Sequence, residues 1–297
     1  MSESLRGKVV FITGPARGIG AAMARLLAAR GATLALVGLE ADLLRGLAAE
    51  LGGRHLWFEC DVTNQPMVER AVRDTVSSLG GIDIVVANAG IASQGTVNVA
   101  ELEALVRVIN VNLIGVLRTA HTTLPHVVER KGYMLLIASL AAFTAMPGLS
   151  AYAASKAGVE QLANVLRMEL NPSGVDVGCA YMSWVDTDLV RDARKDLSTF
   201  DQLLTRLPGP FGTITSLPEC ASQLVAAIES RAETVFVPKS VRSVSRMRML
   251  LSSKFIRRLT RRQFAEQMEE AEAQTRQLGR SFGAHSVGMG TPSGDEP

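Results

Sequence analysis

Short runs of apolar residues alternate with helix-like stretches along most of the chain, and this alternation constrains the fold more than any other feature. The first run, Val9 to Ile12, is followed by an Ala- and Leu-rich stretch that reaches Arg30 and Gly31. Near-continuous apolar strands separated by helices of about 10–15 residues are typical of a parallel sheet covered on both faces. Further strands are predicted at residues 33–37, 56–58, 82–86, 133–137, 175–180 and 234–237. We therefore predict one doubly wound α/β domain over residues 1–238.

The charges of the chain are unevenly distributed. The formal net charge of the 297 residues is +2, which by itself argues against a dedicated nucleic-acid-binding protein. Between Lys239 and Arg262, however, nine residues are basic and none is acidic, so the rest of the chain carries a net charge of −7. We predict that residues 239–282 form a helical extension, first basic and then acidic. The tail at 283–297 is rich in Gly and Ser and is predicted to be disordered.

The basic segment, residues 239–262, has several interpretations. Its apolar residues follow each other at steps of three or four, but arginines interrupt the apolar face. An interfacial helix would make peripheral contact with an anionic membrane. Alternatively, the segment docks on the acidic body of its own or a neighbouring subunit, or it is simply a solvated helix. Nucleic acid is disfavoured as a partner because no recognition motif accompanies the charges.

Cysteine usage and the N-terminus indicate a cytoplasmic protein. Cys60, Cys179 and Cys220 are an odd number of widely spaced cysteines, as expected for small buried residues in a reducing compartment. The first residues contain no apolar signal segment. The uncharged stretch from Gly132 to Ser155 is interrupted by Pro147 and is interpreted as a strand, a loop and a helix start rather than a membrane span. The four histidines form no cluster, so no metal site is assigned.

A glycine-rich loop joins the first predicted strand to the first helix. Gly14, Gly18 and Gly20 have a G-x-x-x-G-x-G spacing, which differs from the G-x-G-x-x-G fingerprint. The physical roles are shared, because glycines permit a tight turn, close approach of backbone to a pyrophosphate and close helix–sheet packing. The helix N-terminus then faces the anion. This arrangement predicts a dinucleotide-binding Rossmann fold.

Further motifs follow in an order that resembles the short-chain dehydrogenase/reductase family. The resemblance covers roughly residues 5–238 and begins with the T-G-x-x-x-G-I-G loop at Thr13. It continues with Asp61 after the third strand and with Asn88-Ala89-Gly90 after the fourth, where Ala87 replaces the family's first asparagine. The remaining motif residues are Asn112, Ser139 and the Y-x-x-x-K pair, Tyr152 and Lys156.

The resemblance implies a nicotinamide cofactor and a set of residues that contact it. These residues are Gly14, Ala16, Arg17, Gly18, Ile19, Gly20, Asp61, Val62, Asn88, Ala89, Gly90, Tyr152, Lys156, Val185 and Thr187. NADP(H) is favoured, because Gly38 stands where an acidic residue would hold the ribose 2′-hydroxyl and Arg17 is able to pair with a 2′-phosphate. Glu40, two residues later, leaves NAD(H) open.

Tyr152 and Lys156 carry the predicted chemistry. A spacing of four residues places both side chains on one face of a helix. A nearby ammonium favours the phenolate, so the pair is suited to moving a proton while hydride is transferred. By resemblance, Lys156 also binds the nicotinamide ribose, Ser139 hydrogen-bonds the reacting oxygen, and Asn112 supports a proton relay through water. One departure is Met182-Ser183, which replaces the family's Pro-Gly pair and puts the conformation of that loop in question.

The sequence predicts an oxidoreductase that interconverts a carbonyl and a secondary alcohol, and a homo-oligomer, either a dimer or a tetramer. The irregular region from Trp184 to Phe211 mixes apolar and basic residues. It is interpreted either as a lid over a bulky, lipid- or steroid-like substrate or as a helix packed on the body. Two alternatives are a non-catalytic dinucleotide-sensing or scaffold protein and an epimerase or dehydratase.

Overall fold

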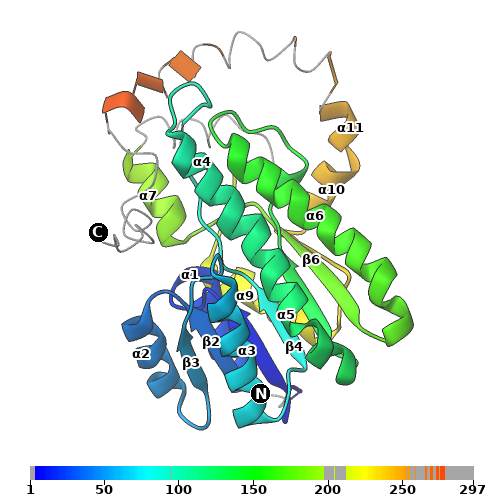
Figure 1. Ribbon diagram of the computed structural model, residues 1–297. Helices are drawn as coiled ribbons and strands as arrows, with labels where there is room; N and C mark the ends of the chain where they lie inside the picture. The colour runs from blue at the N-terminus through cyan, green and yellow to red at the C-terminus, as the bar shows by residue number, and fades with distance from the viewer. Residues whose placement is uncertain are drawn as a thin grey trace.

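The structure is a computed structural model (Figure 1). It describes residues 4–93, 95–196, 204 and 212–251, together with 253, 254, 258, 265, 268, 269, 272, 273 and 275–277. The strands are β1 (Val9–Thr13), β2 (Thr33–Gly38), β3 (Leu56–Glu59), β4 (Ile84–Ala87), β5 (Tyr133–Ile137), β6 (Asp176–Met182), β7 (Trp184–Val185), β8 (Ile214–Thr215) and β9 (Thr234–Val237). The α-helices are α1 (Gly18–Ala29), α2 (Ala41–Leu51), α3 (Gln65–Leu79), α4 (Leu102–Ile109), α5 (Gly115–Glu129), α6 (Ser150–Leu170), α7 (Asp188–Asp196), α9 (Leu217–Glu229), α10 (Val241–Arg246) and α11 (Arg248–Leu251).

Seven strands form one parallel sheet in the order β3-β2-β1-β4-β5-β6-β9. The predicted doubly wound α/β fold is therefore confirmed, and each of the six later strands that the apolar runs predicted overlaps an observed strand of this sheet. The strand order reverses between β1 and β4, because the chain winds outward in both directions from this point. Loops at the carboxyl ends of these two strands diverge to opposite faces, which opens a crevice for ligands.

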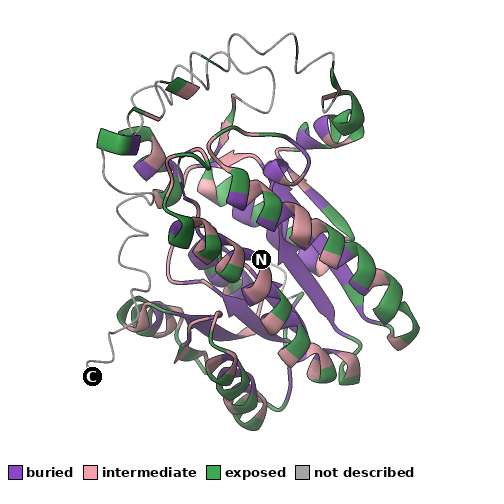
Figure 2. Cartoon of the chain, turned by 45° about the horizontal axis from the view of Figure 1, so that its top comes forward, coloured by how far each residue is buried: buried purple, intermediate pink, exposed green. Residues whose placement is uncertain are grey.

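The core consists of two apolar layers, one on each face of the sheet. Alternate residues of β1 point to opposite layers, with Val10 and Ile12 in one and Phe11 in the other. Helices α1, α2 and α9 cover the first face, and α3, α5 and α6 cover the second. Figure 2 shows the strands as the buried centre of this sandwich. Because both faces of the strands are buried, their sequences are continuously apolar rather than alternating.

The uncharged stretch from Gly132 to Ser155 folds as predicted. It forms β5, a single 3₁₀ turn at Leu140–Ala142, a loop and the first turns of α6. None of the helices in the described part of the chain combines the length and the apolar character that crossing a bilayer requires. Cys60, Cys179 and Cys220 are free thiols and are all buried, as the sequence predicted.

The region after β6 contains elements that the sequence did not predict. Strands β7 and β8 form a separate two-stranded parallel sheet, with Trp184 opposite Ile214 and Val185 opposite Thr215. Helix α7 follows β7, and its Val190 is buried with Leu204 in a small apolar cluster. Part of the region interpreted as a lid is therefore a packed helix, whereas residues 197–203 and 205–211 lie outside the described residues.

The extension begins as a packed part of the body. Val241 and Val244 of α10 are buried in the same apolar layer as α5 and α6. Residues 254, 258 and 265, together with the described residues from 268 to 277, are helical, whereas Phe255, Leu259 and the predicted disordered tail lie outside the described residues.

Two glycines provide a stability test of this packing. A Cβ on Gly178 in β6 would overlap Tyr133 Oη and lie 2.6 Å from the carbonyl oxygen of Ala232. These two atoms are themselves hydrogen-bonded at 2.7 Å, so neither can move freely. We expect Gly178→Ala to lower the free energy of unfolding in urea by about 2–4 kcal/mol.

Gly46→Ala is the matched control. A Cβ on Gly46, which is exposed in α2, has no neighbour within 4 Å. Because alanine has the higher helix propensity, this variant should be more stable by about 0.5–1 kcal/mol. Equal stability of the two variants would contradict the packing described for β5 and β6.

Candidate active site

Asn88 holds the glycine-rich loop in place. Its Nδ2 donates hydrogen bonds to the carbonyl oxygens of Thr13 and Gly14, both at 3.0 Å. In return, Thr13 Oγ1 accepts from the backbone N–H groups of Asn88 and Ala89, both at 3.1 Å. The loops after β1 and β4 are thus locked together at the point where the strand order reverses. The structure gives Asn88 this bracing role in addition to its place beside the pocket.

The backbone of the glycine-rich loop packs tightly against neighbouring backbone, and this leaves space for a ligand. Gly14 and Gly18 have φ values of +66° and +55°. A Cβ on Gly14 would lie 2.8 Å from Ala89 Cα, and one on Gly20 would overlap the carbonyl oxygen of Gly14. The first turn of α1 has no acidic residue and no side-chain cap. Its free N–H groups and helix dipole are therefore available to an anion, and the cradle fits a pyrophosphate.

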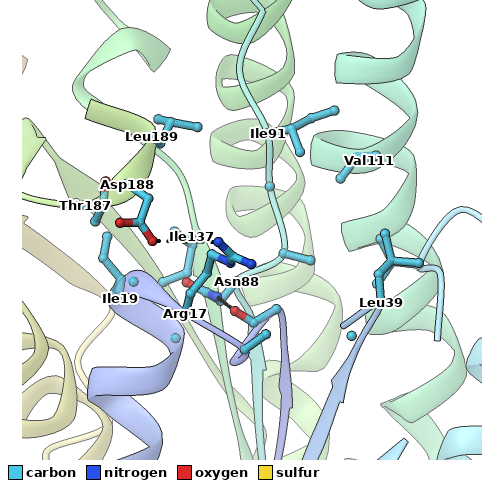
Figure 3. A pocket seen from close by; sticks show the side chains of 18 of the residues that line it. Arg17, Ile19, Leu39, Asn88, Ile91, Val111, Ile137, Thr187, Asp188 and Leu189 are labelled. Carbon is cyan, nitrogen blue, oxygen red and sulfur yellow. Dashed lines mark hydrogen bonds and ion pairs between the residues drawn. The ribbon is translucent and has the colours of Figure 1, made fainter. Parts of the chain in front are cut away.

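A pocket runs along the carboxyl ends of β1 to β5 (Figure 3). It brings together almost all of the residues that the sequence analysis assigned to a cofactor. The lining residues predicted from sequence are Gly14, Ala16, Arg17, Gly18, Ile19, Gly20, Asp61, Val62, Asn88, Ala89, Gly90, Tyr152, Lys156 and Thr187. The start of α7 faces the loop across this pocket, since a Cβ on Gly18 would lie 3.6 Å from Thr187 Cγ2.

Val185 is the exception among the assigned cofactor residues. Its side chain is buried in the core layer formed with α1 and α9 and does not line the pocket.

The Met182-Ser183 pair, which replaces the family's Pro-Gly, has a defined conformation. Met182 pairs with Val237 in the sheet, and the Ser183 N–H donates to the carbonyl oxygen of Val237 at 2.8 Å. The backbone therefore continues β6 up to this point and turns into β7 immediately after it.

Arg17 and Glu40 form an ion pair at one end of the pocket. Arg17 Nε donates to Glu40 Oε2 at 3.1 Å, and Nη2 donates to Oε1, so the contact is bidentate. Arg17 Nη1 also lies 4.0 Å from Asp188 Oδ2. All three residues line the pocket. The arginine that the sequence suggested for a 2′-phosphate is thus already surrounded by two carboxylates.

Tyr152, Lys156 and Ser139 converge beyond the carboxyl end of β5. Tyr152 and Lys156 lie one turn apart on α6, and Lys156 Nζ is 5.7 Å from the centroid of the Tyr152 ring. The hydroxyl of Ser139 is close enough to that of Tyr152 to favour its ionised form. Ser139 ends the strand and starts the short 3₁₀ turn, accepting from the N–H of Ala141 at 3.2 Å. A hydroxyl pair of this kind can bind the oxygen of a carbonyl or alcohol.

Burial affects the pKa values of both Lys156 and Tyr152. Lys156 is only 3% exposed, and burial lowers its pKa to about 8. Burial also raises the pKa of Tyr152, an effect that the hydrogen bond from Ser139 opposes. The attraction between the Lys156 ammonium and a Tyr152 phenolate stays a prediction, and removal of water from the phenol acts against it. With this raised pKa, Tyr152 is protonated at neutral pH and suited to donating a proton.

Asn112 lies at an irregular point between two helices. Residues Asn110–Ile114 form a π-helical turn that joins α4 to α5, and such turns are frequent at functional sites. Asn112 is fully buried; its Oδ1 accepts from the N–H of Ile91 and its Nδ2 donates to the carbonyl oxygen of Ile91, both at 2.8 Å. Nδ2 is also 3.2 Å from Ser155 Oγ. The side chain therefore ties the loop after β4 to α6.

Some lining residues were not assigned to the site from the sequence. Ile91, Val111 and Leu189 form an apolar part of the pocket, which Figure 3 shows on the side away from Arg17. Each comes from a different segment, and Leu189 belongs to the region interpreted as a lid over the substrate. Only their apolar character next to Asn88-Ala89-Gly90, Asn112 and Thr187 could have suggested them.

Asn112 offers a test of how the site is held together. Replacing it with alanine would leave the buried N–H and C=O of Ile91 without partners, so we expect Asn112→Ala to lower the free energy of unfolding by about 2–4 kcal/mol. Urea unfolding measures the change. Asn164→Ala, at an exposed position of α6, is the control and should cost less than about 0.5 kcal/mol. Similar values for both variants would contradict the anchoring role.

Known proteins with related sequences share this site-bearing domain. A family model for short chain dehydrogenases matches residues 8–198. Tropinone reductase-like 1 from Erythroxylum coca is 43% identical over 184 residues, which is 60% of this chain and 67% of that protein. (+)-Borneol dehydrogenase 1 from Salvia officinalis is 32% identical over 240 residues, or 79% of this chain and 92% of that protein.

A third relative matches a similar share of the chain. The 11-beta-hydroxysteroid dehydrogenase-like 4A protein from Arabidopsis thaliana is 32% identical over 247 residues, which is 81% of this chain and 80% of that protein. The family model covers most of the parallel sheet and ends before the extension. The chain belongs to the short-chain dehydrogenase family, whose members are NAD(P)-dependent oxidoreductases.

Proposed function

We propose that this protein interconverts a ketone and a secondary alcohol, with Tyr152 as the general acid and base. The observation that carries this proposal is that Tyr152 and Lys156, with Ser139 beside them, line a pocket whose other end is the glycine-rich loop. In this arrangement one continuous groove holds both a dinucleotide and the hydroxyl pair that acts on the substrate.

In the proposed reduction, the substrate carbonyl oxygen accepts hydrogen bonds from the hydroxyls of Ser139 and Tyr152. A nicotinamide cofactor supplies the hydride that adds to the carbonyl carbon. Tyr152 Oη gives its proton to the oxygen as negative charge develops there, which leaves a phenolate. The ammonium of Lys156, one helical turn away, stabilises this phenolate. The oxidation runs in reverse, with the phenolate accepting the proton of the alcohol.

The structure supports a positioning role for Asn112 rather than a direct one. Its side-chain amide is engaged by Ile91 and Ser155. A Cβ on Gly90 would lie 3.3 Å from Asn112 Oδ1 and 3.5 Å from Lys156 Nζ. Asn112 thus holds the loop after β4 close to the lysine, and the relay through water proposed for the family would start at this contact.

We propose NADP(H) as the preferred cofactor, with Glu40 limiting the preference. Arg17 is the cation available to a 2′-phosphate, and Gly38 presents no carboxylate at the end of β2. The phosphate would have to compete with Glu40 for the guanidinium, because the two are paired. Glu40 also repels a 2′-phosphate directly, whereas the 2′-hydroxyl of NAD(H) would meet no such repulsion. The enzyme is therefore expected to use both cofactors.

We propose a bulky hydrophobic ketone or alcohol as the substrate. Ile91, Val111 and Leu189 give the pocket an apolar part. The relatives include proteins named for tropinone, borneol and a hydroxysteroid, and these names share a ring-bearing carbonyl or alcohol. A panel of cyclic and linear ketones and alcohols, assayed with NADPH, NADH and their oxidised forms, measures the preference. The homo-oligomer and the cytoplasmic location stay predictions.

Tyr152→Phe tests the proposed mechanism. The substitution removes only the hydroxyl, so we expect turnover to fall at least about a hundredfold while cofactor binding, measured by NADPH fluorescence, is retained. Tyr181→Phe is the matched control, because Tyr181 is buried in β6, binds Glu160 and does not line the pocket. It should keep turnover within about threefold. Unchanged turnover in Tyr152→Phe would refute the mechanism.

The pH dependence gives the same test a second readout. Burial raises the pKa of Tyr152, so the acid form needed for reduction predominates at neutral pH. The rate of reduction should therefore fall as the pH rises through this pKa, and the rate of oxidation should increase over the same range. Both dependences should be absent from the residual activity of Tyr152→Phe.

Glu40→Gln tests the cofactor preference. Loss of this carboxylate removes the bidentate partner of Arg17, leaving only Asp188 at 4.0 Å, and reduces the repulsion of the 2′-phosphate. We therefore expect NADPH to bind about tenfold tighter and NADH to change less than about threefold. Fluorescence titration measures both affinities. Glu59→Gln, which removes an exposed carboxylate at the end of β3 outside the pocket, should leave their ratio unchanged. An unchanged ratio in Glu40→Gln would overturn the role given to Glu40.

A further inference from the structure

Helices α10 and α11 present basic and apolar side chains together at the surface. Met247, Met249 and Leu250 are 49%, 82% and 54% exposed. Lys239, Arg242 and Arg246 are exposed beside them. We name these six residues the α10–α11 patch. Large apolar side chains at such exposure, surrounded by one sign of charge, are typical of a surface that contacts a partner.

The patch is held in place by the core of the enzyme. Val241 and Val244 lie on the inner side of α10 and are 0% and 7% exposed. Arg242 and Arg246, four residues apart, therefore lie on its outer side. Figure 2 shows buried and exposed residues together in α10; α11 has no buried residue, but its Leu251 packs, partly buried, against the same apolar layer. The patch is thus a fixed surface and not a freely moving segment.

The basic side chains of the patch are not paired with carboxylates in the described part of the protein. Arg248 Nη1 pairs with Glu160 Oε1 of α6 at 3.1 Å, so one arginine of the basic segment does dock on the body. Among the described residues, none forms an ion pair with Lys239, Arg242 or Arg246. Lys254 and Arg258 are also exposed further along. The patch therefore offers unpaired positive charge to an external anionic surface.

The position of the patch relates it to the active site. Helix α10 begins just after the carboxyl end of β9, and the pocket lies at the carboxyl ends of β1 to β5. All of these strands are parallel and belong to one sheet, so the patch and the pocket lie at the same end of it. A flat surface bound by the patch would therefore lie at the same end of the sheet as the pocket.

We propose that the α10–α11 patch binds the surface of a membrane that contains anionic lipids. Met247, Met249 and Leu250 enter the interfacial region, and Lys239, Arg242 and Arg246 contact the headgroups. Charge complementarity favours this occupant, because the segment 239–262 contains no carboxylate. The proposal goes beyond the redox function and does not depend on it, since binding is measured without turnover.

Co-sedimentation of the full-length protein with vesicles tests the proposal. We expect at least about tenfold stronger binding to phosphatidylcholine vesicles with about 30% phosphatidylserine than to pure phosphatidylcholine, and loss of the difference at about 0.5 M salt. Arg242→Gln with Arg246→Gln should weaken binding by about thirtyfold, because each basic residue contributes about fivefold. Met249→Ser with Leu250→Ser should weaken it by about tenfold.

Matched controls separate the patch from general surface effects. Met168→Ser removes an equally exposed methionine from α6, where the side chain is 80% exposed. Arg70→Gln with Arg73→Gln removes two exposed arginines from α3. Both control proteins should bind vesicles within about twofold of the parent protein, because the substituted residues lie outside the patch. Retained thermal unfolding temperatures in all variants show that folding is not the cause of a change.

Several outcomes would overturn the proposal. Absence of binding to anionic vesicles at low salt would do so, as would equal losses in the patch and control variants. Binding of a duplex oligonucleotide in place of vesicles would assign the patch to nucleic acid. A change in oligomeric state for Met249→Ser with Leu250→Ser, measured by light scattering without vesicle binding, would assign it to a second copy of the chain.

Discussion

The buried ammonium of Lys156 is the interaction on which the rest of the site depends. Its Nζ donates to the carbonyl oxygen of Ile137 at 2.9 Å, which ties α6 to the end of β5 and places Tyr152 beside Ser139. Burial lowers the pKa of this lysine from 10.5 to about 8. Keeping the ammonium charged at neutral pH therefore costs about 3 kcal/mol. Because the folded pKa is depressed, this contribution to stability becomes more favourable as the pH rises from about 8 to 10.5. The fold thus tolerates the destabilising buried charge of Lys156 at the position where the proposed mechanism needs a cation.

The parallel sheet could be predicted because burial on both faces leaves a direct trace in the sequence. Val9 to Ile12 and residues 133–137 are apolar without alternation, and both are central strands. The glycine-rich loop was recognisable for a similar reason, since Gly14 and Gly20 stand where any Cβ would strike backbone. Strands β7 and β8 could not be predicted in this way. Each has only two residues, and the segment that separates them in the sequence has no recognisable pattern.

The site was predictable as a set of residues but not as a set of contacts. Motif order brought Ser139, Tyr152 and Lys156 together correctly, whereas their ionisation depended on how much water the fold removes. Spacing on a helix predicted the attraction between phenolate and ammonium but not the desolvation that opposes it. Likewise, Arg17 and Glu40 are 23 positions apart, and only the turn after β2 makes them partners. Because Arg17 is paired with Glu40, it is not a free cation, and a 2′-phosphate would have to compete with this carboxylate for the guanidinium.

The same distinction applies to the charge of the extension. A basic segment attached to an acidic body suggests attraction between the two, yet several contacts to the body are made by the acidic part. Thr96 Oγ1 donates to Glu272 Oε1 at 2.5 Å, and Thr275 is buried against the loop that contains Gly95. Figures 1 and 2 place this part on the opposite side of the molecule from α10 and α11. The described parts of the extension are therefore attached by packing and hydrogen bonds, and among its described basic residues Arg248 forms an ion pair with the body. Electrostatic attraction between the basic segment and the acidic body is therefore not what positions the extension. The positive charge of the α10–α11 patch remains available to an external surface.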